Sequence, residues 1–236
     1  MRFLNSNRNV VYLLTGIYFL MLFTEVIAEV LIHLPLIIFT RIATPLLLIL
    51  IYTVNSERKN PLFFFILIIL LLSNILFFYK TAPLFYLGII AFIIQRIIMV
   101  VFIFKLLLTK NYQIFVLSTI PFLIIFLYLI LITGEISMIE FSILVIQSLL
   151  ISLLGGLAVS SYIQIDNRAN SWLLISTLLF IGLRFVLFIE KYYLSIISLS
   201  VISPMAVILN FFAFFAFYKF VIAAEQNEKT DLYFPT

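Results

Sequence analysis

Long apolar runs alternate with short polar breaks along the whole chain. Eight runs have close to the 20 or so residues that a membrane-spanning helix needs: Val10–Ile32, Leu36–Val54, Pro61–Phe78, Leu84–Phe104, Gln113–Thr133, Ile139–Ser161, Ser171–Ile189 and Ser198–Val221. The breaks between them, such as residues 56–60 and 164–168, are too short to hold a soluble domain. The pattern predicts an all-α, polytopic transmembrane bundle of eight helices. It forms a single domain over residues 1–223, followed by a short polar cytoplasmic tail over residues 224–236.

The composition excludes several other classes of protein. Of the 236 residues, 65% are hydrophobic and 10% are charged, whereas soluble domains have about 45–50% apolar and about 25% charged residues. The chain has no Cys, so a disulfide scaffold is excluded and a structural zinc or iron–sulfur site is not expected. We expect no metal and no cofactor. The net charge is +4, but the basic residues are dispersed, and we expect no nucleic-acid partner.

The distribution of Lys and Arg predicts the orientation in the membrane. Basic residues accumulate on the cytoplasmic side of membrane proteins. With a cytoplasmic N-terminus, that side holds nine of them and the opposite side holds only Lys80 and Lys191; the nine are Arg2, Arg8, Arg58, Lys59, Lys105, Lys110, Arg168, Lys219 and Lys229. We therefore expect both termini in the cytoplasm and the protein in a bacterial cytoplasmic (inner) membrane.

Five ionisable residues lie within the apolar runs and are the first candidates for function. They are Glu25 and Glu29 in the first run, Arg41 in the second, Arg96 in the fourth and Arg184 in the seventh. A charge at the centre of a membrane helix costs about 2.5–3.5 kcal/mol on insertion scales. We therefore expect these side chains to face the interior of the bundle and to find partners there.

Polar residues of seven runs fall at similar depths in the membrane. At a rise of about 1.5 Å per residue, most lie within about 6 Å of the midplane on its outer side. This layer is the predicted ligand-binding or ion-pair cluster. Besides Glu25, it contains Arg41, Asn74, Arg96, Gln147, Arg184 and Asn210. Two interpretations stay open with about equal weight: ion pairs that fix the register of the helices, or a pocket for an anionic, lipid-like amphiphile.

Glu25 and Glu29 are four residues apart and so share one helix face. Two carboxylates in this position repel each other unless a cation or a shared proton intervenes. Arginines in the other runs could provide the cation. The same two residues are also the candidate catalytic acid–base pair, because carboxyl groups are the acid–base side chains within the spans.

Other sequence features have simpler explanations. The chain has no HExxH, GxSxG or Walker motif, so metalloprotease, serine hydrolase and nucleotide-driven pump activities have no support. We expect Gly155 and Gly156 to allow close packing between helices. We expect His33 to be a turn residue at the membrane interface.

Four short motifs share their spacing with one known family. They are Thr44-Pro45-Leu46, Ser73-Asn74, the segment from Phe92 to Met99 with Arg96 at its centre, and Phe180 with Arg184. From Ile42 to Phe180 and beyond, this spacing resembles the YhhN-type, lysoplasmalogenase-like family. Its corresponding motifs are Lys-Pro-Leu, Gly-Asp, Phe-x-x-x-His-x-x-Tyr and Phe-x-x-Ser-Asp. The resemblance implies an eight-helix membrane fold and hydrolysis of the vinyl-ether bond of lysoplasmalogen to an aldehyde.

The polar residues of these motifs differ from those of the family. Thr44 stands at the Lys position, Asn74 and Arg184 stand at the two Asp positions, and Arg96 stands at the His position. Vinyl-ether hydrolysis needs a proton donor and an activated water, but Asn has no acidic proton and Arg stays protonated in proteins. Either the pocket remains with altered or absent hydrolase activity, or the acid–base work has moved to Glu25 or Glu29.

The alternatives from other classes are a non-enzymatic structural or assembly subunit of a membrane complex and a small transporter. Membrane lipids are the expected partners in each case. Other membrane-protein subunits remain open as further partners.

Overall fold

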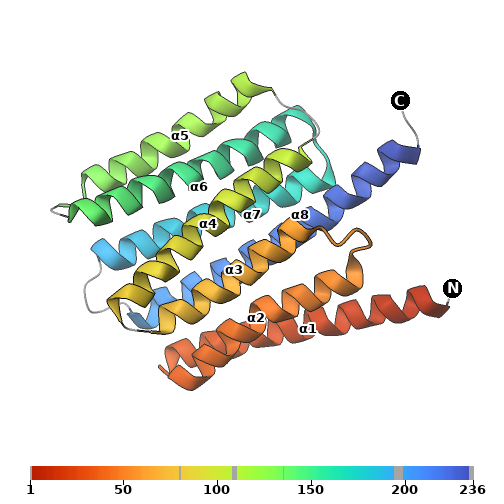
Figure 1. Ribbon diagram of the computed structural model, residues 1–236, viewed down its shortest axis with the longest axis horizontal. Helices are drawn as coiled ribbons and strands as arrows, with labels where there is room; N and C mark the ends of the chain where they lie inside the picture. Colours follow the sequence, from red (N-terminus) through yellow and green to blue (C-terminus); the bar gives the residue numbers. More distant parts are fainter. Residues whose placement is uncertain (1, 80, 108–110, 135, 194–198, 234–236) are drawn as a thin grey trace.

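The computed structural model describes residues 2–79, 81–107, 111–134, 136–193 and 199–233, and the regular elements in this part of the chain are all α-helices (Figure 1). The helices are α1 (Arg2–Val30), α2 (Leu34–Asn55), α3 (Pro61–Phe78), α4 (Ala82–Leu106), α5 (Tyr112–Leu131), α6 (Met138–Gln164), α7 (Arg168–Tyr192) and α8 (Leu199–Tyr233). Each contains a segment long and apolar enough to cross a membrane. The all-helical class and the eight predicted helices are therefore confirmed for the described residues, and their length and composition suit an integral membrane protein.

Polar side chains in the short breaks cap the helices. Asn60, Asn111, Ser137 and Asn167 each accept a hydrogen bond from a backbone N–H in the first turn of α3, α5, α6 and α7. His33 does the same for α2, where its Nδ1 accepts from the N–H of Leu36 over 3.3 Å. These caps satisfy N–H groups that have no partner within the helix. His33 is thus a turn residue, as predicted.

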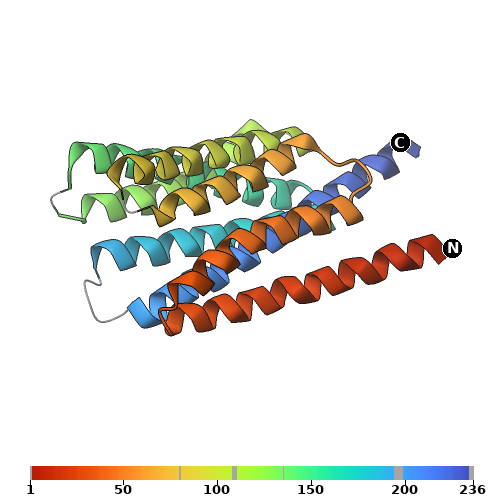
Figure 2. The same cartoon turned by 60° about the horizontal axis from the view of Figure 1, so that its bottom comes forward.

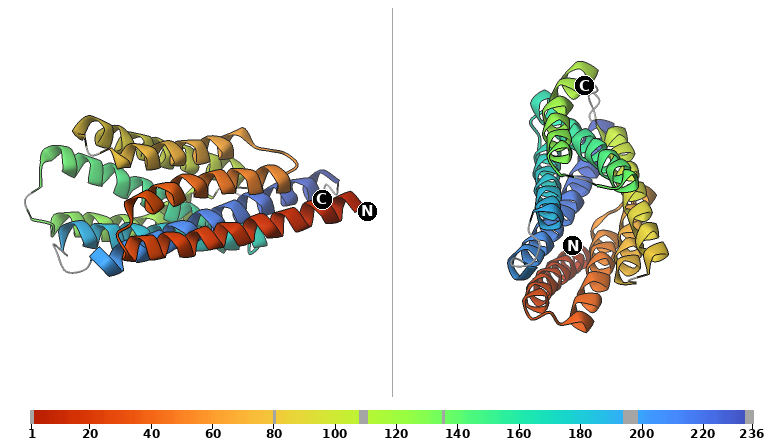
Figure 3. Two further views of the ribbon diagram at one scale, coloured as in Figure 1. Left: turned by 90° about the horizontal axis from the view of Figure 1, so that it is seen from below. Right: turned by 90° about the vertical axis from the view of Figure 1, so that its left-hand side faces the viewer.

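Successive helices pack as antiparallel hairpins, α1 with α2, α3 with α4, α5 with α6 and α7 with α8 (Figures 1 and 2). The last hairpin returns to the first, because α8 also packs against α1 and α2. The beginning of α1 and the end of α8 lie at the same end of the bundle (Figure 3). Of the residues in the charge count, Lys80 and Lys110 lie outside the described residues, as do the side chains of Arg2 and Lys229.

The aromatic residues divide between the core and the outer surface. Tyr18, Tyr52, Phe63 and Phe217 are fully or almost fully buried, whereas Phe23 is 66% exposed. Gly155 and Gly156 lie where α6 meets α5, and a Cβ on Gly156 would overlap the Thr119 side chain. The predicted role of these glycines in helix packing is confirmed.

The helix α8 continues into the segment assigned to the polar tail. Ala224 and Glu225 are buried, and the Glu225 carboxylate accepts hydrogen bonds from Tyr52 Oη over 2.5 Å and Ser56 Oγ over 2.7 Å. Tyr52 Oη accepts in turn from the N–H of Asn60 over 2.7 Å. This network ties α8 to the loop between α2 and α3, and residues 234–236 of the predicted tail lie outside the described residues.

Candidate functional site

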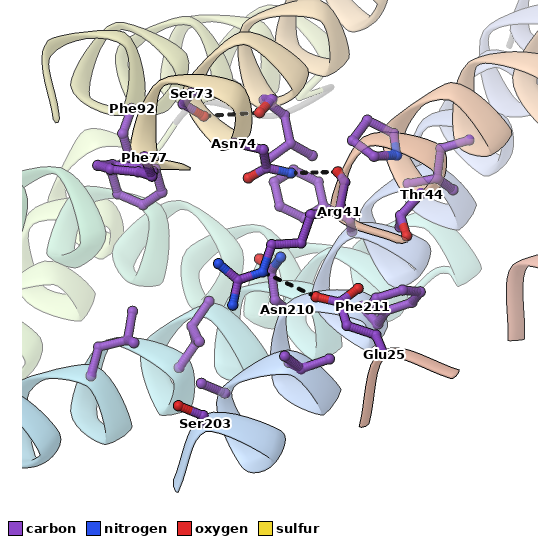
Figure 4. A pocket seen from close by; sticks show the side chains of 18 of the residues that line it. Glu25, Arg41, Thr44, Ser73, Asn74, Phe77, Phe92, Ser203, Asn210 and Phe211 are labelled. Atoms are coloured by element: carbon purple, nitrogen blue, oxygen red, sulfur yellow. Dashed lines mark hydrogen bonds and ion pairs between the residues drawn. The ribbon is translucent and has the colours of Figure 1, made fainter. Parts of the chain in front are cut away.

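A cavity of about 350 Å³ lies among α1, α2, α3, α4, α7 and α8, and its lining residues on α1 are in the second half of that helix. Figure 4 shows this cavity from close by. Four of the predicted site residues line it: Glu25, Arg41, Asn74 and Asn210. Apolar side chains such as Leu48 and Phe211 complete its wall. The cavity thus combines polar groups and apolar surface in the interior of the bundle.

Arg41 is paired with both carboxylates of α1. Its Nε lies 3.3 Å from Glu25 Oε1 and its Nη2 lies 2.5 Å from Glu29 Oε1 (the Glu25 pair is drawn in Figure 4). The spacing of four residues places both carboxylates toward one arginine, so a cation does separate them. Glu29 does not line the cavity, whereas Glu25 does, and Glu25 Oε2 is buried without a hydrogen-bond partner among the described residues.

Asn74 is tied to a backbone irregularity in α2. Pro45 lies inside α2 and has no N–H, so it cannot donate to the carbonyl oxygen of Arg41 four residues earlier. Asn74 Nδ2 from α3 donates to this oxygen over 2.9 Å (Figure 4). The side chain that stands at an Asp position of the resembled family therefore replaces a missing helical hydrogen bond.

Three further predicted site residues line a second cavity of about 190 Å³, whereas Glu29 lines neither cavity. Arg96 from α4, Gln147 from α6 and Arg184 from α7 contribute its polar groups. The two cavities share a wall, formed by Phe77, Phe92, Leu183 and Leu187. The predicted polar layer is thus arranged around two adjoining cavities, with the paired arginine on one side and two further arginines on the other.

Arg96 is held by aromatic rings. It is 5% exposed, and its guanidinium carbon lies 4.0 Å from the centre of the Phe180 ring and 5.0 Å from that of Phe92. Its described hydrogen bond runs from Nη1 to the sulfur of Met99, over 3.7 Å. Cation–π contacts of this kind stabilise a desolvated arginine, but they do not neutralise its charge.

Arg184 has two donors without a partner. Its Nε and Nη2 are buried and make no hydrogen bond within the part of the chain that the structure describes. Among the described residues, no carboxylate lies within 4.0 Å of either Arg96 or Arg184. The smaller cavity therefore holds two guanidinium groups that no acidic side chain neutralises.

The polar residues of the larger cavity that were not predicted as site residues include Glu190 and Ser203. Ser203 Oγ donates to Glu190 Oε1 over 3.3 Å. The predicted seventh span ended at Ile189, which placed Glu190 just outside it. The spacing of Leu183, Leu187 and Glu190 follows one helix face and was the available signal.

The described residues include no group of three or more His, Cys, Asp or Glu side chains that could hold a metal ion. No family model, curated protein or solved structure matches the chain. The resemblance to the lysoplasmalogenase-like family stays a prediction.

Proposed function

We propose that this chain is an integral protein of a bacterial inner membrane, with cytoplasmic termini, that binds a lipid-like anionic amphiphile in its two adjoining cavities. Its hydrolase activity is altered or absent relative to the family that it resembles. The observation that carries the proposal is the pair Arg96 and Arg184, which line a cavity without a carboxylate within 4.0 Å among the described residues.

The alternative of an ion-pair lock fits Arg41 but not the other two arginines. A lock requires each buried charge to have a partner, because an unpaired charge in the membrane interior is costly. Arg41 meets this condition through Glu25 and Glu29. Arg96 and Arg184 do not, and the space beside them supports binding of an external anion.

The mixed character of the walls supports an amphiphile rather than a free ion. A cavity of about 350 Å³ falls within the range of about 300–1,000 Å³ for ligand pockets, which are mostly apolar with a few polar groups. The shared wall of Phe77, Phe92, Leu183 and Leu187 offers apolar contact along the path between the cavities. An acyl chain can lie there while its charged group reaches the arginines.

The residues at the motif positions support altered or absent hydrolysis. Asn74 uses its amide to hold the Arg41 carbonyl oxygen, and Arg96 and Arg184 cannot donate protons near neutral pH. Glu25 lines the larger cavity and keeps one buried carboxylate oxygen without a hydrogen-bond partner among the described residues. A binding role needs none of the missing acids.

The test is a comparison of lipid retention between two variants of α8. Val207 is buried and lines the larger cavity, whereas its neighbour Ile208 is 38% exposed and does not. Native mass spectrometry of the purified protein in mild detergent should detect a bound anionic lipid in the wild type and in Ile208→Phe, and much less in Val207→Phe. Equal retention in all three, or no bound lipid in the wild type, would contradict the proposal.

A further inference from the structure

We infer that the smaller cavity is the head-group site, and that it takes a doubly charged oxyanion, a phosphate monoester, between Arg96 and Arg184. The inference rests on the proposed function and specifies the charge and class of the ligand. It depends on three features of the two cavities: their charges, the unpaired donors of an arginine that lines the smaller one, and the path between them.

The charges of the two cavities differ in sign. In the larger one, Arg41 is shared by Glu25 and Glu29, and Glu190 adds a further carboxylate. In the smaller one, Arg96 and Arg184 are the charged residues among those that line it. An anion is therefore repelled by the larger cavity and attracted by the smaller one.

The size of the positive charge selects a dianion. Two guanidinium groups lining one small cavity repel each other strongly, since water screens little inside a membrane bundle. A carboxylate or a phosphate diester carries one negative charge and leaves one positive charge without a partner. A phosphate monoester carries close to two negative charges above neutral pH and neutralises both groups.

The free donors of Arg184 have the geometry that an oxyanion needs. Nε and Nη2 form one edge of the guanidinium plane, and both are buried without a hydrogen-bond partner among the described residues. This edge can hold two oxygens of one phosphate in a bidentate pair. The rings of Phe180 and Phe92 contact Arg96, which fixes its guanidinium group beside the cavity, and the amide of Gln147 lines the same space.

The path between the cavities accommodates the rest of the ligand. Phe77, Phe92, Leu183 and Leu187 line both cavities, so a chain attached to the phosphate leaves the arginines along an apolar surface. Beyond it, Leu70 and Phe214 continue that surface in the larger cavity. A monoester with a single alkyl chain fits this arrangement, with its head in the smaller cavity.

The experiment compares two amphiphiles of equal chain length that differ in charge. The full-length protein in mild detergent at about pH 8, where a phosphate monoester is dianionic, is titrated with monododecyl phosphate, methyl dodecyl phosphate and inorganic phosphate. Native mass spectrometry measures occupancy. We expect the monoester to bind the wild type at least about tenfold more tightly than the diester, as one additional charged hydrogen-bonded contact would produce.

Variants of α7 identify the site. Arg184→Gln should lose most of the preference for the monoester, and Arg184→Lys should retain part of it, because a lysine keeps the charge but not the bidentate edge. Lys191→Gln removes a charge from the same helix outside both cavities and should leave the preference unchanged. The wild-type comparison does not depend on any variant folding.

The outcomes separate this inference from the proposed function. Equal affinity for both dodecyl compounds would contradict the inference that the ligand is a dianion, but it would still support a binding site for an anionic amphiphile. If neither compound binds, the proposed function fails as well. Inorganic phosphate could also bind as tightly as monododecyl phosphate, with Arg184→Gln abolishing the binding of both. That result would support a dianion site whose ligand is the free ion, and it would contradict the proposal of an amphiphilic ligand.

Discussion

Asn74 donates its side-chain amide to the carbonyl oxygen of Arg41 over 2.9 Å, across the interface between α3 and α2. This oxygen would accept from the residue at position 45 in a regular helix, but Pro45 has no N–H. The side chain of one helix therefore repairs the backbone of its neighbour. The pairing also places Asn74 and Arg41 together on the wall of the larger cavity.

A double-mutant cycle tests this relationship. Asn74→Ala should destabilise the protein by about 0.5–1.5 kcal/mol, the range of hydrogen bonds between membrane helices. In a Pro45→Ala background the cost should fall close to zero, because the new N–H at position 45 can donate to the Arg41 oxygen. Unfolding in mixed detergent, followed by circular dichroism, measures each variant. An equal cost in both backgrounds would mean that Asn74 acts through another contact.

Removing the arginine of the α1–α2 pair should be more harmful than removing one of its carboxylates. Arg41→Met leaves Glu25 and Glu29 facing each other and should cost about 1–2 kcal/mol, below the value for a fully buried pair because the Arg41 side chain is 37% exposed. Adding Glu29→Gln to Arg41→Met should restore part of the loss, since one negative charge disappears. The same unfolding assay applies; no recovery in the double variant would argue against carboxylate repulsion.

The contact between α5 and α6 leaves no space for a methyl group at Gly156. A Cβ there would overlap Thr119 Oγ1 and lie 3.0 Å from the Thr119 Cα, so backbone as well as side chain is in the way. Gly156→Ala should therefore destabilise the fold by about 1–3 kcal/mol, as overpacking does. Gly16→Ala is the matched control, because nothing lies within 4 Å of a Cβ at that position. A neutral Gly156→Ala would show that the two helices can separate at little cost.

The distribution of basic residues predicts which loops face the cytoplasm, and the absence of Cys makes this easy to measure. Thr81→Cys in the loop before α4 should react with a membrane-impermeant maleimide in whole cells. Arg58→Cys in the loop before α3 should react only after permeabilisation. The opposite pattern would invert the orientation, and labelling of both in intact cells would contradict the alternation of the loops.

The residues at the motif positions predict little or no vinyl-ether hydrolysis. The purified protein should release no aldehyde from lysoplasmalogen under conditions in which an active member of the resembled family does. If aldehyde does appear, Glu25→Gln decides whether the acid–base work has moved to α1. If Glu25→Gln releases no aldehyde while the neighbouring variant Thr24→Ser still does, Glu25 is catalytic. That result would contradict the prediction that the protein does not hydrolyse the vinyl-ether bond.

The helices were predictable from sequence because each apolar run must satisfy its own backbone hydrogen bonds in a membrane. The break at residues 56–60 lies between helices in the structure, as predicted, and that at 164–168 is shorter, because α6 ends at Gln164 and α7 begins at Arg168. The course of α8 was less predictable. Glu225 is charged and follows the last apolar run, so its sequence context suggested a tail. Its burial depends on Tyr52 and Ser56, whose approach comes from tertiary packing.

The sequence predicted most residues of the candidate site, but it did not predict which arginine pairs with which carboxylate. Helical spacing placed Glu25 and Glu29 on one face, and they do share one cation. Nothing in the sequence distinguished Arg41 from Arg184 as their partner, because both were assigned to the same depth. The choice follows from the α1–α2 hairpin, which brings residues 25 and 41 together while α7 packs elsewhere.

The hydrogen bonds of Glu225 also determine when one end of the bundle can be completed. Tyr52 precedes its acceptor by 173 residues, a stretch that a ribosome needs about 10–35 s to synthesise. During that interval α2 and α3 can already span the membrane, yet the loop between them lacks the carboxylate that orders it. This loop therefore reaches its native conformation late in biogenesis, only after α8 has been inserted beside α2.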